Sequence, residues 1–187
     1  MMSSTAEGLS RALGAVGHLV SGVRDDQWAA PTPCTEWTVW DLTNHLVVVN
    51  LTIAALIDGR TPPERTADLV GDDPAGAYRN SAAALRTVCE QPGALDRTIE
   101  GPLGTAKVAE RLTLRIADLL VHAWDLAQAT GLPLDLPEDL VEKALSFGQS
   151  PEFAAARADR FAAALAVADD APAIDRLIAL TGRMNRS

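Results

Sequence analysis

The sequence predicts an all-α protein, an antiparallel four-helix bundle with additional short helices towards the C-terminus. Four long segments place apolar residues at the three- and four-residue steps of amphipathic helices. Hydrophobic residues make up 48% of the chain and aromatic residues only 4%, and alanine and leucine dominate, whereas strands prefer β-branched and aromatic residues. The connections between the long segments are short, which favours antiparallel neighbours.

Length, charge and cysteine content narrow the class of protein. A chain of 187 residues is expected to form a single domain over residues 1–187, with a core large enough to fold without disulfides or metal. The net charge of -9 argues against nucleic acid and anionic membranes as partners. No run of apolar residues is expected to reach the length of a transmembrane helix, and the first residues lack the layout of a signal peptide. Cys34 and Cys89 are too few for a disulfide framework. These features predict a cytoplasmic protein.

The first helix is predicted from about Ala6 to Val23. Its apolar residues form one helical stripe: Leu9, Leu13, Val16, Val20 and Val23. His18 lies about 200° around the helix from Val16, so it faces away from that stripe. We therefore expect His18 to be a solvated surface residue and not a ligand.

The second helix is predicted to begin after Thr38, which acts as the N-cap with Asp41 completing an approximate capping box. Its apolar residues alternate steps of three and four, as in the seam of a helical bundle: Val39, Leu42, Leu46, Val49, Ile53 and Leu56. His45 lies about 60° from Leu42, at the border of this stripe. It is therefore expected to point into a groove between helices. Gly59 ends the element.

The third helix is predicted to start at Asp73, with Pro74 in its first turn, and to end before Pro92. Only the segment 94–105 could be extended, and Thr98–Ile99 is expected to be too short to support a sheet. After the fourth helix, a fifth is predicted near Pro137, and the tail 151–187 is predicted to form two shorter helices around residues 169–172.

The fourth helix, predicted from about Lys107 to Thr130, carries a polar row along one border of its apolar stripe: Arg111, Arg115, Asp118, His122 and Asp125. Asp118 and His122 are four residues apart, so their side chains share one face about 6 Å apart along the axis. A carboxylate and an imidazole so placed can hold one metal ion, and His45 is the candidate third ligand. Three nitrogen and oxygen ligands with open positions suit catalytic zinc, and nickel is possible.

Ordinary structural roles stay open for each of these residues. An acid and a histidine four apart commonly form a surface pair, and a border histidine is commonly structural. Asp125 is expected to support His122 from the second shell or to substitute as a ligand. Arg115 could support a metal ligand from the second shell, bind an anionic substrate or thiol, or form a surface salt bridge. Cys34, beside Trp37 and a helix N-terminus, could be a nucleophile or a packing residue.

Two segments resemble a known family. Residues 32–46, Thr-Pro-Cys-Thr-Glu-Trp-Thr-Val-Trp-Asp-Leu-Thr-Asn-His-Leu, resemble the signature of the DinB-like metal-binding proteins, and more closely their mycothiol-dependent maleylpyruvate isomerase N-terminal branch. Residues 118–131 resemble that branch's second motif, an acid and a histidine four apart followed by Trp-Asp-Leu and Ala-Thr-Gly. Residues 170–172 and 175–177 resemble the single-domain members of the branch.

The resemblance implies a DinB-like four-helix bundle with a divalent metal, most often zinc, held by the residues matching His45, Asp118 and His122. It also implies a low-molecular-weight thiol such as mycothiol as co-substrate. Asp118 departs from the pattern, since the isomerase has glutamate at the matching position. The isomerase also has a C-terminal domain that supplies part of its active site, and this chain is too short to include it.

Two functions of different classes follow. The first is a metal-dependent enzyme that uses a mycothiol-type thiol on small electrophilic substrates, as an S-transferase or an isomerase. The second is a non-catalytic helical module that binds a ligand or forms a homodimer, with a structural metal or none. An open coordination position distinguishes them, since structural zinc sites are filled by a fourth protein ligand.

Overall fold

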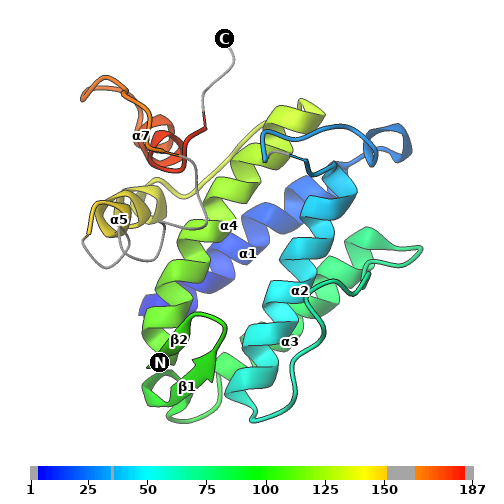
Figure 1. Ribbon diagram of the computed structural model, residues 1–187, viewed down its shortest axis with the longest axis vertical. Helices are drawn as coiled ribbons and strands as arrows, with labels where there is room; N and C mark the ends of the chain where they lie inside the picture. Colours follow the sequence, from blue (N-terminus) through cyan, green and yellow to red (C-terminus); the bar gives the residue numbers. More distant parts are fainter. Residues whose placement is uncertain (1–3, 35, 151–162, 184–187) are drawn as a thin grey trace.

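A computed structural model describes residues 4–34, 36–150 and 163–183 (Figure 1). Four long helices form a bundle: α1 (Ser4–Gly22), α2 (Val39–Ile57), α3 (Pro74–Cys89) and α4 (Val108–Thr130). Each of them packs against two others, because α1 contacts α3 and α4 and α2 contacts the same pair. The prediction of an all-α four-helix bundle is confirmed.

Local signals in the sequence set the helix ends. The backbone N–H of Thr38 donates to Asp41 Oδ2 at 2.9 Å, and Thr38 Oγ1 accepts from the Asp41 N–H at 3.2 Å, which completes the predicted capping box of α2. Asp73 caps α3 by accepting from the Gly76 N–H at 2.8 Å. Gly131 ends α4 in the left-handed conformation, with φ of 70°.

The core fills the space between the four helices. The largest fully buried apolar side chains are mostly leucines from the predicted stripes, among them Leu9, Leu13, Leu42, Leu46, Leu112 and Leu119. Tyr78 of α3 is buried with them, and its hydroxyl donates to the Leu13 carbonyl at 3.1 Å. His18 is exposed, as predicted from its position on α1.

A β-hairpin precedes α4, and the expectation that this segment could not support a sheet is wrong. Strands β1 (Thr98–Gly101) and β2 (Gly104–Lys107) pair antiparallel, with a 3-10 turn, η2 (Ala94–Asp96), before them. Gly104 has a φ of 80°, which a tight turn requires and which glycine adopts without strain. Ile99 is buried against the bundle, so the hairpin is stabilised by packing as well as by its ladder.

Helix α2 is long and apolar enough to cross a membrane by length and composition, contrary to the expectation that no run approaches that length. Its 19 residues have a mean hydropathy of 1.4. However, 56% of this stretch is buried inside the bundle, and a buried core helix meets the same criterion. The packing of α2 against α3 and α4 accounts for its apolar composition.

Two shorter helices lie beside α4, on the side away from α2 and α3: α5 (Glu138–Gly148) and α7 (Ala173–Leu180) (Figure 1). Helix α5 packs on α4, and α7 packs on α5. Of the two helices predicted in the tail, α7 is the second, and the segment 151–162 lies outside the described residues. The chain turns back after α7 at Gly182, whose φ is 77°.

Candidate metal centre

Helices α2 and α4 bring together the three residues whose positions in the sequence predicted a metal site. One ligand atom each from His45, Asp118 and His122 lies within 4.8 Å of the others. The two imidazole rings have centroids 5.1 Å apart, and His122 Nε2 is 3.3 Å from Asp118 Oδ1. The borders of the two apolar stripes therefore face each other between α2 and α4, as their helical phases predict.

His122 is oriented by a buried carboxylate. Its ring is 5% exposed, and its Nδ1 lies 3.0 Å from Asp125 Oδ2, which leaves Nε2 facing Asp118. A carboxylate on the second ring nitrogen is the arrangement that orients histidine ligands in metal sites. Burial opposes the charged form of His122, but the carboxylates of Asp118 and Asp125 outweigh it and raise the pKa of this imidazole.

His45, on α2, has a different environment. Its ring lies against the Trp37 indole, with centroids 4.7 Å apart, and is partly buried. Burial lowers the pKa of His45 to about 4, and the nearby charges of His122 and Arg115 act in the same direction. At neutral pH this imidazole is therefore uncharged, which is the form that can bind a metal ion.

Arg115 is buried, so the expectation of a surface salt bridge is wrong, whereas its contacts agree with the expectation that it supports a candidate ligand. It is 2% exposed, and its guanidinium donates to Asn50 Oδ1 at 2.8 and 3.2 Å and to the Leu46 carbonyl at 3.0 Å. It also forms a hydrogen-bonded ion pair with Asp118 Oδ2. Arg115 therefore fixes the Asp118 carboxylate from the interior of the bundle.

The charges around Asp118 determine its ionisation. Burial raises the pKa of this carboxyl group, but His122 and Arg115 outweigh burial and hold the pKa well below its usual range. Asp118 is consequently a carboxylate at any physiological pH. Its Oδ2 is engaged by Arg115, while its Oδ1 faces His122.

Sequence reasoning missed two residues that support the centre. Asn50 interrupts the apolar run of α2, is fully buried, and connects Arg115 to Ser81 of α3 through a 3.1 Å hydrogen bond. Arg183, just after α7, donates to both oxygens of Asp125, at 2.8 and 2.9 Å. A buried polar residue within an apolar stripe was a visible signal for Asn50. Nothing local indicated Arg183, which is 58 residues from its partner.

A short loop before α2 covers the centre. It carries Cys34 and Trp37, and Thr32 Oγ1 donates to the carbonyls of both, at 3.1 and 2.9 Å. Glu36 in this loop has a φ of 71°, a left-handed conformation that costs a non-glycine residue about 1 kcal/mol or more. The loop therefore keeps the Trp37 ring against His45 at some cost in backbone strain.

A second group of possible ligands, Cys34, His122 and Asp125, also lies within 4.8 Å. This second group is less suitable for binding a metal ion than the group that contains His45. Burial raises the pKa of the Cys34 thiol, so the thiolate that binds metals is disfavoured. Asp125 is fully buried and already accepts two hydrogen bonds from Arg183. These properties favour a packing role for Cys34 and a supporting role for Asp125 behind His122.

The fold places the protein in the DinB-like class of helical bundles. It is similar to a DinB-like protein of Bacillus subtilis, with a TM-score of 0.54 and 15% identity, over 72% of this chain and 96% of that one. Two crystal structures of mycothiol-dependent maleylpyruvate isomerase, one of them a mutant, give a TM-score of 0.63 at 16% and 17% identity. Those matches cover 79% of this chain and 70% of the isomerase, and they establish the fold.

The sequence comparison identifies the family. The model of the mycothiol maleylpyruvate isomerase N-terminal domain matches residues 9–127, and the chain belongs to this family. The matched range includes His45, Asp118 and His122. Two uncharacterised proteins of Mycobacterium tuberculosis, from strains CDC 1551 / Oshkosh and ATCC 25618 / H37Rv, are each 35% identical over 183 residues. These matches cover 94% of this chain and 96% of each relative.

Proposed function

We propose that the protein binds one divalent metal ion, zinc or less favourably nickel, through His45, Asp118 and His122. With it, the protein would use a mycothiol-type thiol on small electrophilic substrates, as an S-transferase or an isomerase. The observation that carries the proposal is the convergence of the three candidate ligand atoms within 4.8 Å, between α2 and α4. Family membership supports the thiol and the metal.

The donor set fits a divalent ion of this kind. Two imidazoles and one carboxylate suit zinc or nickel, and His45 is uncharged at neutral pH. Among the described residues, the group that contains His45 has three members, one fewer than structural zinc sites use, so positions for a thiol or substrate stay open. When bound, a divalent metal lowers the pKa of a coordinating thiol and so supplies a thiolate nucleophile.

The residues of this chain hold the site in shape. Asp125 orients the His122 ring so that Nε2 faces Asp118, and Arg115 fixes the Asp118 carboxylate. Trp37 lies against both imidazoles, with ring centroids 4.7 Å from His45 and 6.2 Å from His122, and so limits the access of water from that side.

One observation favours the alternative, a non-catalytic helical module with a structural metal or none. Asp118 already forms ion pairs with Arg115 and His122, and among the described residues no buried polar side-chain atom is left without a hydrogen bond. The bundle therefore does not depend on a metal for internal charge balance. Such a module could act as a homodimer or bind a small ligand.

Metal analysis of protein purified without a histidine tag tests the first half of the proposal. We expect about one divalent ion per chain, and we expect His45→Ala and His122→Ala each to lose it. His18→Ala is the matched control, because His18 is an exposed histidine outside this site and its loss should leave the metal in place. If His18→Ala removes the metal as effectively as the other two variants, the assignment of ligands is wrong.

A chelation experiment separates a catalytic site from a structural one. The metal-free protein should keep its helical circular dichroism, because the core is large and buried independently of the site. Adding 2-mercaptoethanol or mycothiol to cobalt-substituted protein should then produce a sulfur-to-metal charge-transfer band. Loss of the helical signal on chelation supports the structural alternative. A cobalt spectrum that ignores both thiols contradicts the thiol-dependent function but not metal binding.

A further inference from the structure

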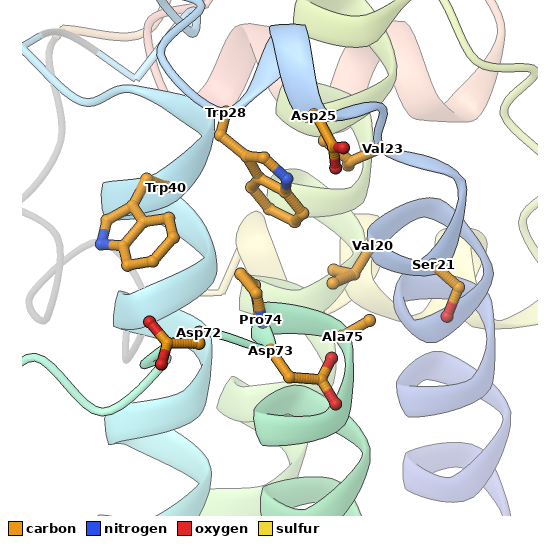
Figure 2. A pocket seen from close by; sticks show the side chains of 10 residues that line it. All are labelled: Val20, Ser21, Val23, Asp25, Trp28, Trp40, Asp72, Asp73, Pro74 and Ala75. Carbon is orange, nitrogen blue, oxygen red and sulfur yellow. The ribbon is translucent and has the colours of Figure 1, made fainter.

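A cavity of about 430 Å³ lies at the end of the bundle where the first loop begins. It is bounded by the C-terminal end of α1, the 3-10 turn η1 (Asp25–Gln27) and the N-terminal ends of α2 and α3 (Figure 2). None of its lining residues belongs to the candidate metal centre. Trp40, which lines it, is five residues before His45 and so lies about 140° around α2 from that ligand. The cavity is therefore a separate feature.

Two tryptophans form one wall. The rings of Trp28 and Trp40 have centroids 6.2 Å apart and an interplanar angle of 86°, an edge-to-face pair. The backbone N–H of Trp40 donates to the backbone carbonyl of Trp28 at 3.0 Å, which fixes the two residues relative to each other. Figure 2 shows the Trp28 ring projecting into the space next to Trp40. Indole faces carry negative electrostatic potential and attract cations.

Three carboxylates complete the lining: Asp25, Asp72 and Asp73. Among the described residues, no lysine, arginine or histidine lines the cavity. Neither Asp25 nor Asp72 forms a salt bridge with another described residue, and Arg24, next to Asp25 in the chain, pairs instead with Asp26 at 3.1 Å. Asp73 is partly engaged, since it caps α3 and lies 3.9 Å from Arg79.

The carboxylates of the lining outweigh the partial positive charge at the N-terminus of α3. The N-terminus of α3 contributes about half a positive charge, which the capping Asp73 offsets. Asp25 and Asp72 then leave the cavity negative. Because both are exposed, their field acts over roughly a Debye length of about 8–10 Å and is weakened by salt.

We propose that this cavity binds a small organic cation, an alkylammonium or quaternary ammonium compound. Its charged group lies against the indoles of Trp28 and Trp40 and is neutralised by Asp25 and Asp72. The volume is in the range of small-molecule sites, and aromatic walls with nearby carboxylates are the chemistry that recognises ammonium groups. This site is independent of the metal-dependent function proposed above.

A pair of probes of nearly equal shape tests the charge requirement. Choline and its uncharged isostere 3,3-dimethylbutan-1-ol are titrated into the full chain, with calorimetry and tryptophan fluorescence as readouts. We expect choline to bind saturably, with a dissociation constant on the order of 1 mM or tighter, and the isostere to bind at least about tenfold more weakly. Raising the salt concentration should weaken the choline complex.

Variants locate the site. Asp25→Asn and Asp72→Asn should each weaken choline binding by about three- to tenfold, whereas Asp96→Asn, at an exposed position outside the lining, should not. Trp28→Leu should weaken it by about tenfold or more. Because Trp28 also packs against the core, the aspartate variants decide the result if Trp28→Leu does not fold.

Three results overturn the proposal. The first is equal affinity for choline and its isostere, which would mean that the cavity binds apolar groups without regard to charge. The second is the absence of saturable choline binding. The third is an Asp96→Asn effect as large as that of Asp25→Asn, which would mean that cations are attracted generally to an acidic protein.

Discussion

On the α4 side of the candidate metal centre, Asp118 and His122 each have charged hydrogen-bonding partners, Arg115 and Asp125. On the α2 side, the His45 side chain forms no hydrogen bond or salt bridge with another residue that the structure describes. Its ring lies against Trp37. The two histidines are accordingly shifted in opposite directions: the pKa of His122 is raised and that of His45 is lowered to about 4. The candidate ligands on α4 are positioned by charged hydrogen bonds, and the one on α2 is positioned by packing.

Removing Asp125 should have the largest effect, because the α4 side depends on it. Asp125→Ala leaves the Arg183 guanidinium, whose side chain is 9% exposed, without its partner, and leaves His122 unsupported. We expect the free energy of unfolding to fall by about 3–5 kcal/mol, measured by urea denaturation of the metal-free protein. Asp139→Ala is the matched control, since it removes an exposed, solvent-screened ion pair with Arg11 and should lower the free energy of unfolding far less. Equal losses would show that charge does not position the α4 side.

The opposite shifts of the two histidines predict a pH dependence of stability. The pKa of folded His45 is about 4, whereas an unfolded histidine titrates near 6.5, so only the unfolded chain takes up this proton between those values. The metal-free protein should therefore lose up to about 3 kcal/mol from His45 as pH falls from about 6.5 to about 4. His122 has the opposite sign: because its folded pKa is raised, its contribution is complete below about pH 6.5 and is lost as pH rises through the folded pKa.

Urea denaturation of the metal-free protein across this range, with His45→Leu, separates the two contributions. The variant should lose most of the destabilisation towards pH 4, while His18→Leu, at an exposed position, should keep it. An unchanged pH profile for His45→Leu would contradict the assignment of a packed, uncharged imidazole to the α2 side.

A smaller effect is expected from changing the ligand that the charges position. Asp118→Asn keeps the size of the side chain but removes its negative charge, so metal affinity should fall by about 10- to 100-fold while the helical circular dichroism stays unchanged. Asp118→Glu should stay within about tenfold of the native affinity, because it keeps a carboxylate at this position. A competition titration against a chelator measures both. Glutamate binding as weakly as asparagine would mean that the position set by Arg115 matters more than the charge.

The sequence was sufficient to predict the bundle and the proximity of His45, Asp118 and His122, whereas their role as ligands stays a prediction. Helical phase is a local property, so the positions of His45 against Leu42 and of His122 against Asp118 follow from spacing alone. Whether a border residue is buried depends on the neighbouring helix, and that information is not local. The sequence therefore left open whether Arg115 supports the site, binds a substrate or lies at the surface, and the structure surrounds it with Asn50 and Leu46 of α2.

Contacts outside a single element were the other limit. The strand Thr98–Gly101 is stabilised by its partner Gly104–Lys107, and Thr105, the predicted end of the extended segment, lies inside that partner. Arg183 was missed because it reaches Asp125 only after the chain has passed through α5 and α7. The assignment of the whole chain to one domain stays a prediction, although the contact between these two residues connects the end of the described chain to α4.

The position of Arg183 has a consequence for how fragments of this protein are made. The family match ends at residue 127, and a fragment cut there would contain His45, Asp118 and His122. It would lack the guanidinium that neutralises Asp125, and would so leave that negative charge directly behind His122, one of the candidate ligands. The candidate ligands and the residue that balances their charges are thus encoded at separate places in the chain.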